Sequence, residues 1–280
     1  MGGKERRFAQ VDVFGADALL GNPVAVVIDG DGLSDAEMAR FARWTNLSET
    51  TFLLPPSDPA ADYRLRIFTP GGELPFAGHP TLGSAHAWLK TGGVPEHADR
   101  VVQQCGAGLV ELRRDAHRLA FAAPPLLRSG KVDEETLERV VASLRIAKTD
   151  VLAAEWVDNG PGWLAVLLRS ASDVLALAPD FAAMGDLKVG VVASQPDGQD
   201  TDFEVRGFVP AFGIPEDPVT GSLNGGLAMW LIGSGRAPAA YVAAQGTALG
   251  RAGRVHVEHA HGRHWIGGDT RTIVSGTVRI

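Results

Sequence analysis

One segment of this 280-residue chain occurs twice, and this duplication restricts the possible folds more than any other feature. The first copy covers residues 66–84 and the second covers residues 206–222. Arg, Phe and two Pro residues recur at one offset, and a further Pro, Gly and Ser recur at a slightly smaller offset. A match of this kind within a short stretch predicts an internal repeat, and therefore two related lobes.

The two copies differ at the residue best suited to handle a proton. His79 in the first copy stands where Asp217 stands in the second, and each is followed by proline. A site that draws one group from each lobe would contain two different acid–base groups. Such a site suits the movement of a proton on a small molecule.

Both copies have the pattern of a strand, a turn and a helix. Arg-x-Phe-x-Pro alternates with period two and ends at a proline, which is typical of a strand that stops. Pro80 and Pro218 suit the first position of a helix. The pattern therefore predicts His79 and Asp217 as N-caps of helices whose free amides attract anions such as a carboxylate. The alternative is that Asp217 is only a cap and His79 only a turn residue.

Composition excludes several classes of partner. The formal net charge of −7, with scattered Lys and Arg, argues against nucleic acid and against anionic membranes. Cys105 is the single cysteine, so no disulfide can form within the chain, which is typical of a reducing compartment. No stretch reaches the length of a membrane-spanning helix, and the N-terminal residues lack an apolar signal core. We therefore expect a cytoplasmic protein that binds neither nucleic acid nor membrane.

Helix signals alternate with hairpin signals in both halves, which predicts an α+β fold rather than a doubly wound parallel sheet. Ser34 and Glu37 form a capping-box pattern at the start of one helix, and Asp133 begins another. The strand-like stretches are residues 8–14, 24–28, 52–54, 63–68, 106–112, 118–121, 163–168, 189–193, 203–208, 241–244, 254–258, 264–266 and 273–280.

Prolines and glycines refine this organisation. Pro124-Pro125 is the best candidate for a link, so the first lobe is expected to end at residue 123 and the second to begin at residue 124. Gly221, Gly225 and Gly226 fall within the helix of the second repeat, although glycine there costs roughly 1 kcal/mol relative to alanine. These glycines predict that a sheet surrounds the helix too closely for side chains.

Five stretches of the sequence together resemble the PhzF-like family, which is named for phenazine biosynthesis. They are Asn22-Pro-Val-Ala, Asn46-Leu-Ser-Glu-Thr-Thr-Phe, Glu73-Leu-Pro-Phe-Ala-Gly-His-Pro-Thr-Leu-Gly-Ser, Glu216-Asp-Pro-Val-Thr-Gly-Ser and Gln245-Gly-Thr-Ala-Leu-Gly-Arg. The resemblance implies a diaminopimelate-epimerase-like fold, in which two pseudo-symmetric lobes each wrap a curved sheet around a central helix. It also implies an active-site cleft between the lobes, a final strand (residues 272–280) that returns to the first lobe, and a homodimer.

The resemblance also assigns roles to individual residues. The proton-transferring glutamate of the family falls on Glu49. Its substrate-orienting histidine, its aspartate and its serine fall on His79, Asp217 and Ser222, and the backbone of Gly78 and Gly221 completes the substrate site. The implied reaction is a cofactor-independent isomerisation of a small metabolite that carries a carboxylate. A carboxylate of the enzyme removes a proton from carbon and returns it elsewhere, which moves a double bond; the family's namesake acts in this way on a dihydro-hydroxyanthranilate.

The residues themselves support this assignment less sharply. A general base for C–H removal needs a carboxylate whose pKa burial has raised, and the largely apolar run after Glu49 could supply that burial. The alternative is a solvated loop glutamate. Epimerases of the related fold use two opposed thiols, but Ala77 precedes Gly78-His79 and Cys105 lies outside both repeats, which argues against that chemistry.

Two other functions stay open. The histidines of residues 256–264 could bind a metal ion in a metal-dependent hydrolase, although their spacing matches no common zinc signature, so we expect no metal site. The chain could also be a binding protein that has kept the fold without the chemistry. The presence of Glu49, His79, Asp217 and Ser222 together argues against that second alternative.

Overall fold

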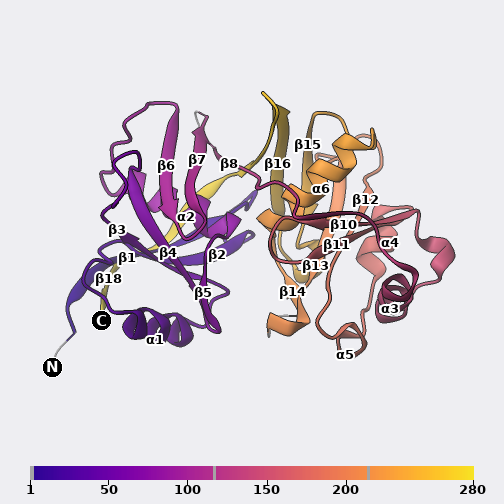
Figure 1. The fold of residues 1–280 in the computed structure, drawn as a ribbon, viewed down its shortest axis with the longest axis horizontal. Coiled ribbons are helices and arrows are strands. Elements are labelled where there is room, and N and C mark those ends of the chain that lie inside the picture. Colours follow the sequence, from indigo (N-terminus) through magenta and orange to yellow (C-terminus); the bar gives the residue numbers. More distant parts are fainter. Residues whose placement is uncertain (1–2, 116–117, 213–214) are drawn as a thin grey trace. The chain divides into compact units, whose positions relative to one another are not determined.

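A computed structural model describes residues 3–115, 118–212 and 215–280 of the chain (Figure 1). The chain divides into two compact units. The first comprises Met1–Ala122 and Gly267–Ile280, and the second comprises Ala123–Ile266. No helix within the described residues has both the length and the apolar character that a membrane span needs.

The first unit is a mixed sheet with two helices, α1 (Asp35–Thr45) and α2 (Gly78–Lys90). Its strands are β1 (Glu5–Val13), β2 (Asn22–Val27), β3 (Thr50–Leu54), β4 (Tyr63–Thr69), β5 (Gly72–Leu74), β6 (Arg100–Cys105), β7 (Gly108–Arg114), β8 (Leu119–Ala122) and β18 (Thr270–Arg279). Strand β18 comes from the end of the chain and pairs antiparallel with β1. Helix α1 packs against β2, β3 and β4 through a cluster that includes Met38, Phe41 and Phe52.

The second unit has the helices α3 (Glu134–Leu144), α4 (Ala171–Ala176), α5 (Phe181–Met184) and α6 (Gly221–Gly233). Its strands are β9 (Arg128–Lys131), β10 (Ala153–Asp158), β11 (Trp163–Leu167), β12 (Lys188–Ser194), β13 (Phe203–Phe208), β14 (Glu216–Asp217), β15 (Ala240–Gln245), β16 (Gly253–Ala260) and β17 (Arg263–Gly268), the last of which ends beyond the unit boundary. Its apolar core packs α3, α4 and α5 against β11 and β12.

The strands of the two units pair in the same series, which confirms the duplication. In the first unit β1–β2 is antiparallel, β2–β3 parallel, β3–β4 and β4–β5 antiparallel, β4–β6 parallel and β6–β7 antiparallel. In the second unit the pairs from β10 to β16 follow the same order and directions. The outer pairs β1–β18 and β10–β9 are both antiparallel.

Each unit has one central helix, α2 or α6, among its strands (Figure 1). Glycines allow this close packing, as the sequence predicts. A Cβ atom on Gly226 of α6 would lie 2.2 Å from the carbonyl oxygen of Val157, and one on Gly225 would lie 3.0 Å from the Cβ of Ala123. In α2 a Cβ atom on Gly83 would lie 2.4 Å from the Cγ1 of Val24. At these distances a side chain would force the strand away from the helix.

The helix-start predictions are partly right. The capping box of Ser34 and Glu37 at α1 and the Asp133 cap at α3 are confirmed. The prediction that His79 and Asp217 are N-caps is wrong, because α2 begins one residue before His79 and α6 begins four residues after Asp217. Both side chains have other partners than a helix amide: His79 contacts Asn22, and Asp217 accepts a hydrogen bond from Thr220.

Strand register also corrects the alignment of the two repeats. Phe68 pairs with Glu73 across β4–β5, and Phe208 pairs with Glu216 across β13–β14. Glu73 and Glu216 therefore match, and so do the residues directly after them, Leu74 and Asp217. Helix α2 begins four residues after Leu74, and α6 begins four residues after Asp217. The second helical residues, His79 and Ser222, therefore match. The prediction that His79 and Asp217 occupy matching positions is wrong, because the recurring Pro, Gly and Ser are not in structural register.

Candidate active site

Glu49 and His79 lie in contact within the first unit. His79 Nε2 and Glu49 Oε2 are 3.3 Å apart, and their side chains are only 6 % and 15 % exposed. Glu49 directly precedes β3, and His79 is the second residue of α2. The two elements are joined nearby, because the hydroxyls of Thr51 and Ser84 lie 2.8 Å apart. The fold therefore places the Glu49 carboxylate in contact with the His79 imidazole, and both groups are largely shielded from solvent.

Burial changes the acidity of this carboxylate. Removal from water raises the pKa of Glu49 to about 7, and the hydrogen bond from Ser48 opposes this change without cancelling it. A carboxyl group with a pKa near neutrality exists in both protonation states at neutral pH. It can therefore accept a proton and give it back, as a general acid–base catalyst must.

Asn22 orients His79, although its sequence motif indicated no role for it. Asn22 is the first residue of β2, and its Nδ2 lies 3.4 Å from Nδ1 of His79. An amide nitrogen only donates, so Nδ1 acts as the acceptor and the proton of a neutral imidazole stands on Nε2. That N–H faces Glu49. The available signal was the Asn22-Pro-Val-Ala motif, whose asparagine stands two residues before the predicted strand 24–28.

In the second unit, a buried network holds Asp217. The Thr220 hydroxyl donates to Asp217 Oδ2 at 2.6 Å, and Gln245 Nε2 donates to the Asp217 carbonyl oxygen at 3.2 Å. Gln245 is fully buried, and its Oε1 accepts from the Thr220 amide and from Asn224 Nδ2. Gln245 begins one of the five sequence motifs, but the motif alone gave no reason for it. In the structure, Gln245 supports the turn of residues 217–220, which carries Asp217.

Gly78, Gly221 and Ser222 lie at the starts of the two central helices. Gly78 and Gly221 are the first residues of α2 and α6. The Ser222 hydroxyl accepts a hydrogen bond from Trp163 Nε1 at 3.0 Å, so its own proton can be donated to another acceptor. Both helix starts therefore combine backbone amides with a polar side chain at the second helical position, His79 in one unit and Ser222 in the other.

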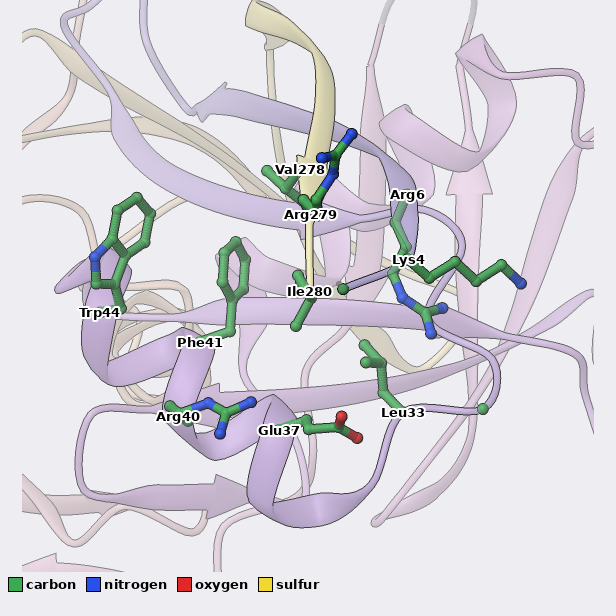
Figure 2. A pocket seen from close by; sticks show the side chains of 12 residues that line it. Lys4, Arg6, Leu33, Glu37, Arg40, Phe41, Trp44, Val278, Arg279 and Ile280 are labelled. Atoms are coloured by element: carbon green, nitrogen blue, oxygen red, sulfur yellow. The ribbon is translucent and has the colours of Figure 1, made fainter. Parts of the chain in front are cut away.

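A surface groove of about 820 Å³ lies elsewhere in the first unit. Figure 2 shows Phe41 and Trp44 of α1 on one side of this groove and Val278 and Ile280 near the chain end on the other. None of the six candidate residues contributes to its lining. The groove is therefore separate from the candidate catalytic groups.

The histidines of residues 256–264 do not converge on a common point in the structure. The rings of His259 and His264 stack with centroids 4.4 Å apart and planes inclined by 20°. Burial, followed by the neighbouring His259, lowers the pKa of His264. Within the described residues, no group of three or more His, Cys, Asp or Glu side chains is arranged to hold a metal ion.

Comparisons with known proteins extend these observations. The family model described as phenazine biosynthesis-like protein matches residues 11–278. The protein named antisense-enhancing sequence 1 from Schizosaccharomyces pombe is 37 % identical, and the match covers 97 % of this chain and 98 % of that protein. A trans-2,3-dihydro-3-hydroxyanthranilate isomerase from Pseudomonas aeruginosa is 38 % identical over 80 % of this chain and 79 % of its own length.

A solved structure confirms the expected fold class. A phenazine biosynthesis protein of the PhzF family from Enterococcus faecalis superimposes with a TM-score of 0.82 at 26 % identity. The match covers 99 % of this chain and all of that chain. The α+β fold with two related units is thus the fold of that family.

Proposed function

Because the chain belongs to the phenazine biosynthesis-like family and is an isomerase, we propose that it moves a proton within a small metabolite that carries a carboxylate, with Glu49 as the general acid and base. The observation that carries this proposal is the contact of the Glu49 carboxyl group, with its pKa near 7, and the His79 imidazole. A shielded carboxyl group that titrates near neutrality is otherwise costly to a fold.

The proposed reaction involves no net oxidation, so it calls for no redox cofactor. Ionised Glu49 takes a proton from a saturated carbon, and the electron pair of the broken C–H bond forms a new double bond. The original double bond shifts by one position, and its far carbon takes the proton back from Glu49. The Nε2–H group of His79, which faces Glu49 in this structure, would donate a hydrogen bond to the substrate oxygen on which negative charge develops once substrate is bound.

The remaining candidate residues would bind the substrate. The amides at the starts of α2 and α6 and the Ser222 hydroxyl suit a carboxylate group. Asp217 would hold an amine or a second mobile proton. Glu49 and His79 belong to one unit, and Asp217 and Ser222 belong to the other. The proposal therefore requires that groups from both units act on one substrate.

The Pseudomonas aeruginosa relative suggests the first substrate to test. Its name specifies trans-2,3-dihydro-3-hydroxyanthranilate, a cyclic diene with a carboxylate and an amine. We expect this chain to act on a compound of that class, in the cytoplasm and as a homodimer. Light scattering of the purified protein tests the homodimer.

The test of the function tracks the proton. In deuterated water, turnover should place deuterium on the product carbon that receives the proton, unless the carboxyl group is fully shielded from solvent. Glu49→Gln keeps the shape of the side chain but removes the base, so turnover should fall by about two to four powers of ten while binding persists. Glu138→Gln, on the exposed face of α3, is the control and should leave turnover unchanged. Near-normal turnover by Glu49→Gln would refute the role of this carboxylate.

The second candidate function is that of a binding protein that has kept the fold. The relative from Schizosaccharomyces pombe has a name that states no catalytic activity, although it matches almost the whole chain. In that case the wild-type protein and Glu49→Gln would bind the same metabolites, and neither would exchange a substrate proton with solvent.

A further inference from the structure

The arginine of each repeat forms a two-pronged fork with a glutamate on the next strand. Arg206 donates from Nε and Nη2 to the two oxygens of Glu216, at 2.9 and 2.7 Å, and both side chains are buried. Arg66 donates in the same way to Glu73, at 2.7 and 2.6 Å. Each guanidinium group also lies over the ring of the phenylalanine two residues later, at 4.9 Å in the second unit and 5.0 Å in the first. This geometry explains the recurring Arg-x-Phe.

The third donor of each guanidinium group reaches a helix. Arg206 Nη1 donates to the carbonyl oxygens of Val174 and Leu177 at the end of α4, at 3.2 and 2.8 Å. Arg66 Nη1 donates to Asp35 in the first turn of α1 at 2.6 Å. Each arginine thus joins three elements: the strand that carries it, the short hairpin strand and a helix.

The two forks differ in the residue next to the glutamate. Glu216 precedes Asp217, whereas Glu73 precedes Leu74, an apolar residue with no candidate role. Strand β14 has only two residues, and its ladder with β13 consists of two residue pairs. So short a ladder does not fix the direction of a side chain by itself. The Thr220 hydroxyl binds the Asp217 carboxylate directly, and the rigid planar fork on Glu216 ties the preceding residue to β13 and α4.

We propose that the Arg206–Glu216 fork is a positioning device for Asp217, an inference that rests on the proposed role of Asp217 in the reaction. Buried ion pairs contribute little net stability, because the cost of removing both charges from water offsets their attraction. Fixed orientation is the better reason for this pair. The Arg66–Glu73 fork has the same connections without an acid–base residue beside it, so the chain contains its own control.

Arg206→Lys keeps the charge but cannot form two parallel bonds. We expect kcat to fall by roughly tenfold to a hundredfold with a smaller change in KM, because a displacement of about 1 Å in a reacting group costs rate rather than affinity. Arg206→Lys also loses bonds to the carbonyl oxygens at the end of α4, so the midpoint of thermal unfolding should fall as well. Arg66→Lys, the matched control, should stay within about threefold of the wild-type kcat.

A second measurement does not depend on turnover. Hydrogen exchange at the amides of residues 216, 217, 219 and 220 should speed up in Arg206→Lys, while the amides of residues 73, 74, 76 and 77 should keep their protection. If Arg206→Lys does not fold, Glu216→Gln and its control Glu73→Gln replace the pair of lysine variants.

The outcomes separate this proposal from the proposed function. Unchanged exchange at residues 216, 217, 219 and 220 in Arg206→Lys would overturn the positioning role, and so would an equal loss of kcat in Arg66→Lys. Faster exchange with undiminished kcat would also overturn it. If the wild-type protein turns over no compound of the proposed class, the function fails on its own, and the exchange comparison still decides whether the fork holds the Asp217 turn.

Discussion

Glu49, the proposed catalytic carboxyl group, lowers the stability of its own fold when it is ionised. Its pKa is raised from 4.5 to about 7 in the folded protein, so between these values the folded state binds more protons than the unfolded state. The free energy of unfolding therefore falls as the pH rises through this window. Above about pH 7 the full penalty is present, about 3 kcal/mol for a shift of this size.

This penalty predicts that Glu49→Gln stabilises the protein at high pH while it abolishes turnover. The variant should gain up to about 3 kcal/mol over the wild type at about pH 8, and the gain should vanish below about pH 4.5, where the wild-type carboxyl group is protonated in both states. Urea denaturation at the two pH values measures the difference. An equal gain at both would mean that packing, not ionisation, is responsible.

Asn22 determines which nitrogen of His79 carries the proton. Asn22→Asp replaces a donor by an acceptor, so the imidazole proton should move to Nδ1 and a lone pair on Nε2 should face Glu49. We expect kcat to fall about a hundredfold or more, because the donor toward the substrate is lost. Nitrogen chemical shifts of the His79 ring report the tautomer directly. Wild-type kcat with the tautomer reversed would exclude this role.

At the scale of elements, the central helices depend on glycines that touch strands. Gly226→Ala should destabilise the protein by about 1–3 kcal/mol, because the new Cβ atom would overlap the Val157 carbonyl oxygen at 2.2 Å. Gly233→Ala, at the end of the same helix, meets no atom within 4 Å and should stabilise by about 0.5–1 kcal/mol. Thermal unfolding of the two variants measures the contrast. A loss of stability in both would point to the helix backbone rather than to the strand contact.

The sequence predicted the elements better than their register. Capping signals located α1 and α3, and alternation located most long strands, because these signals are local. The hairpin from β4 to β5 turns through residues 70–71, whereas residues 209–215 connect β13 to β14. Because the two loops differ in length, α6 begins at a different point of the sequence repeat than α2 does. The recurring Pro, Gly and Ser, which match by coincidence, concealed this difference. Strands β5 and β14 went unrecognised because they are short, and β6, β9 and β10 were missed as well.

The candidate site was predictable to a similar extent. Family motifs gave Glu49 and His79, and the structure brings these two into contact. Supporting residues such as Asn22 and Gln245 could not be assigned, because their function is a hydrogen bond to a residue far along the chain. Propensity and spacing do not report such bonds.

At the scale of the whole molecule, the proposed function predicts that one chain supplies every candidate residue of its site. Glu49 and Asp217 lie in different units of the same chain, and the proposed function needs both. If the protein is a homodimer with such sites, a heterodimer of Glu49→Gln and Asp217→Ala protomers contains two defective sites. Mixing the two inactive variants should therefore restore no activity.

The opposite arrangement makes a different prediction. If each site took Glu49 from one protomer and Asp217 from its partner, half of the sites in every heterodimer would be intact. After random exchange of subunits, on the order of a quarter of the wild-type activity would return. Exchange is verified by the capture of tagged with untagged protomers after dilution and reassembly. Recovered activity at that level would show that Glu49 and Asp217 of one chain do not act on the same substrate. Each site would then be shared between two protomers.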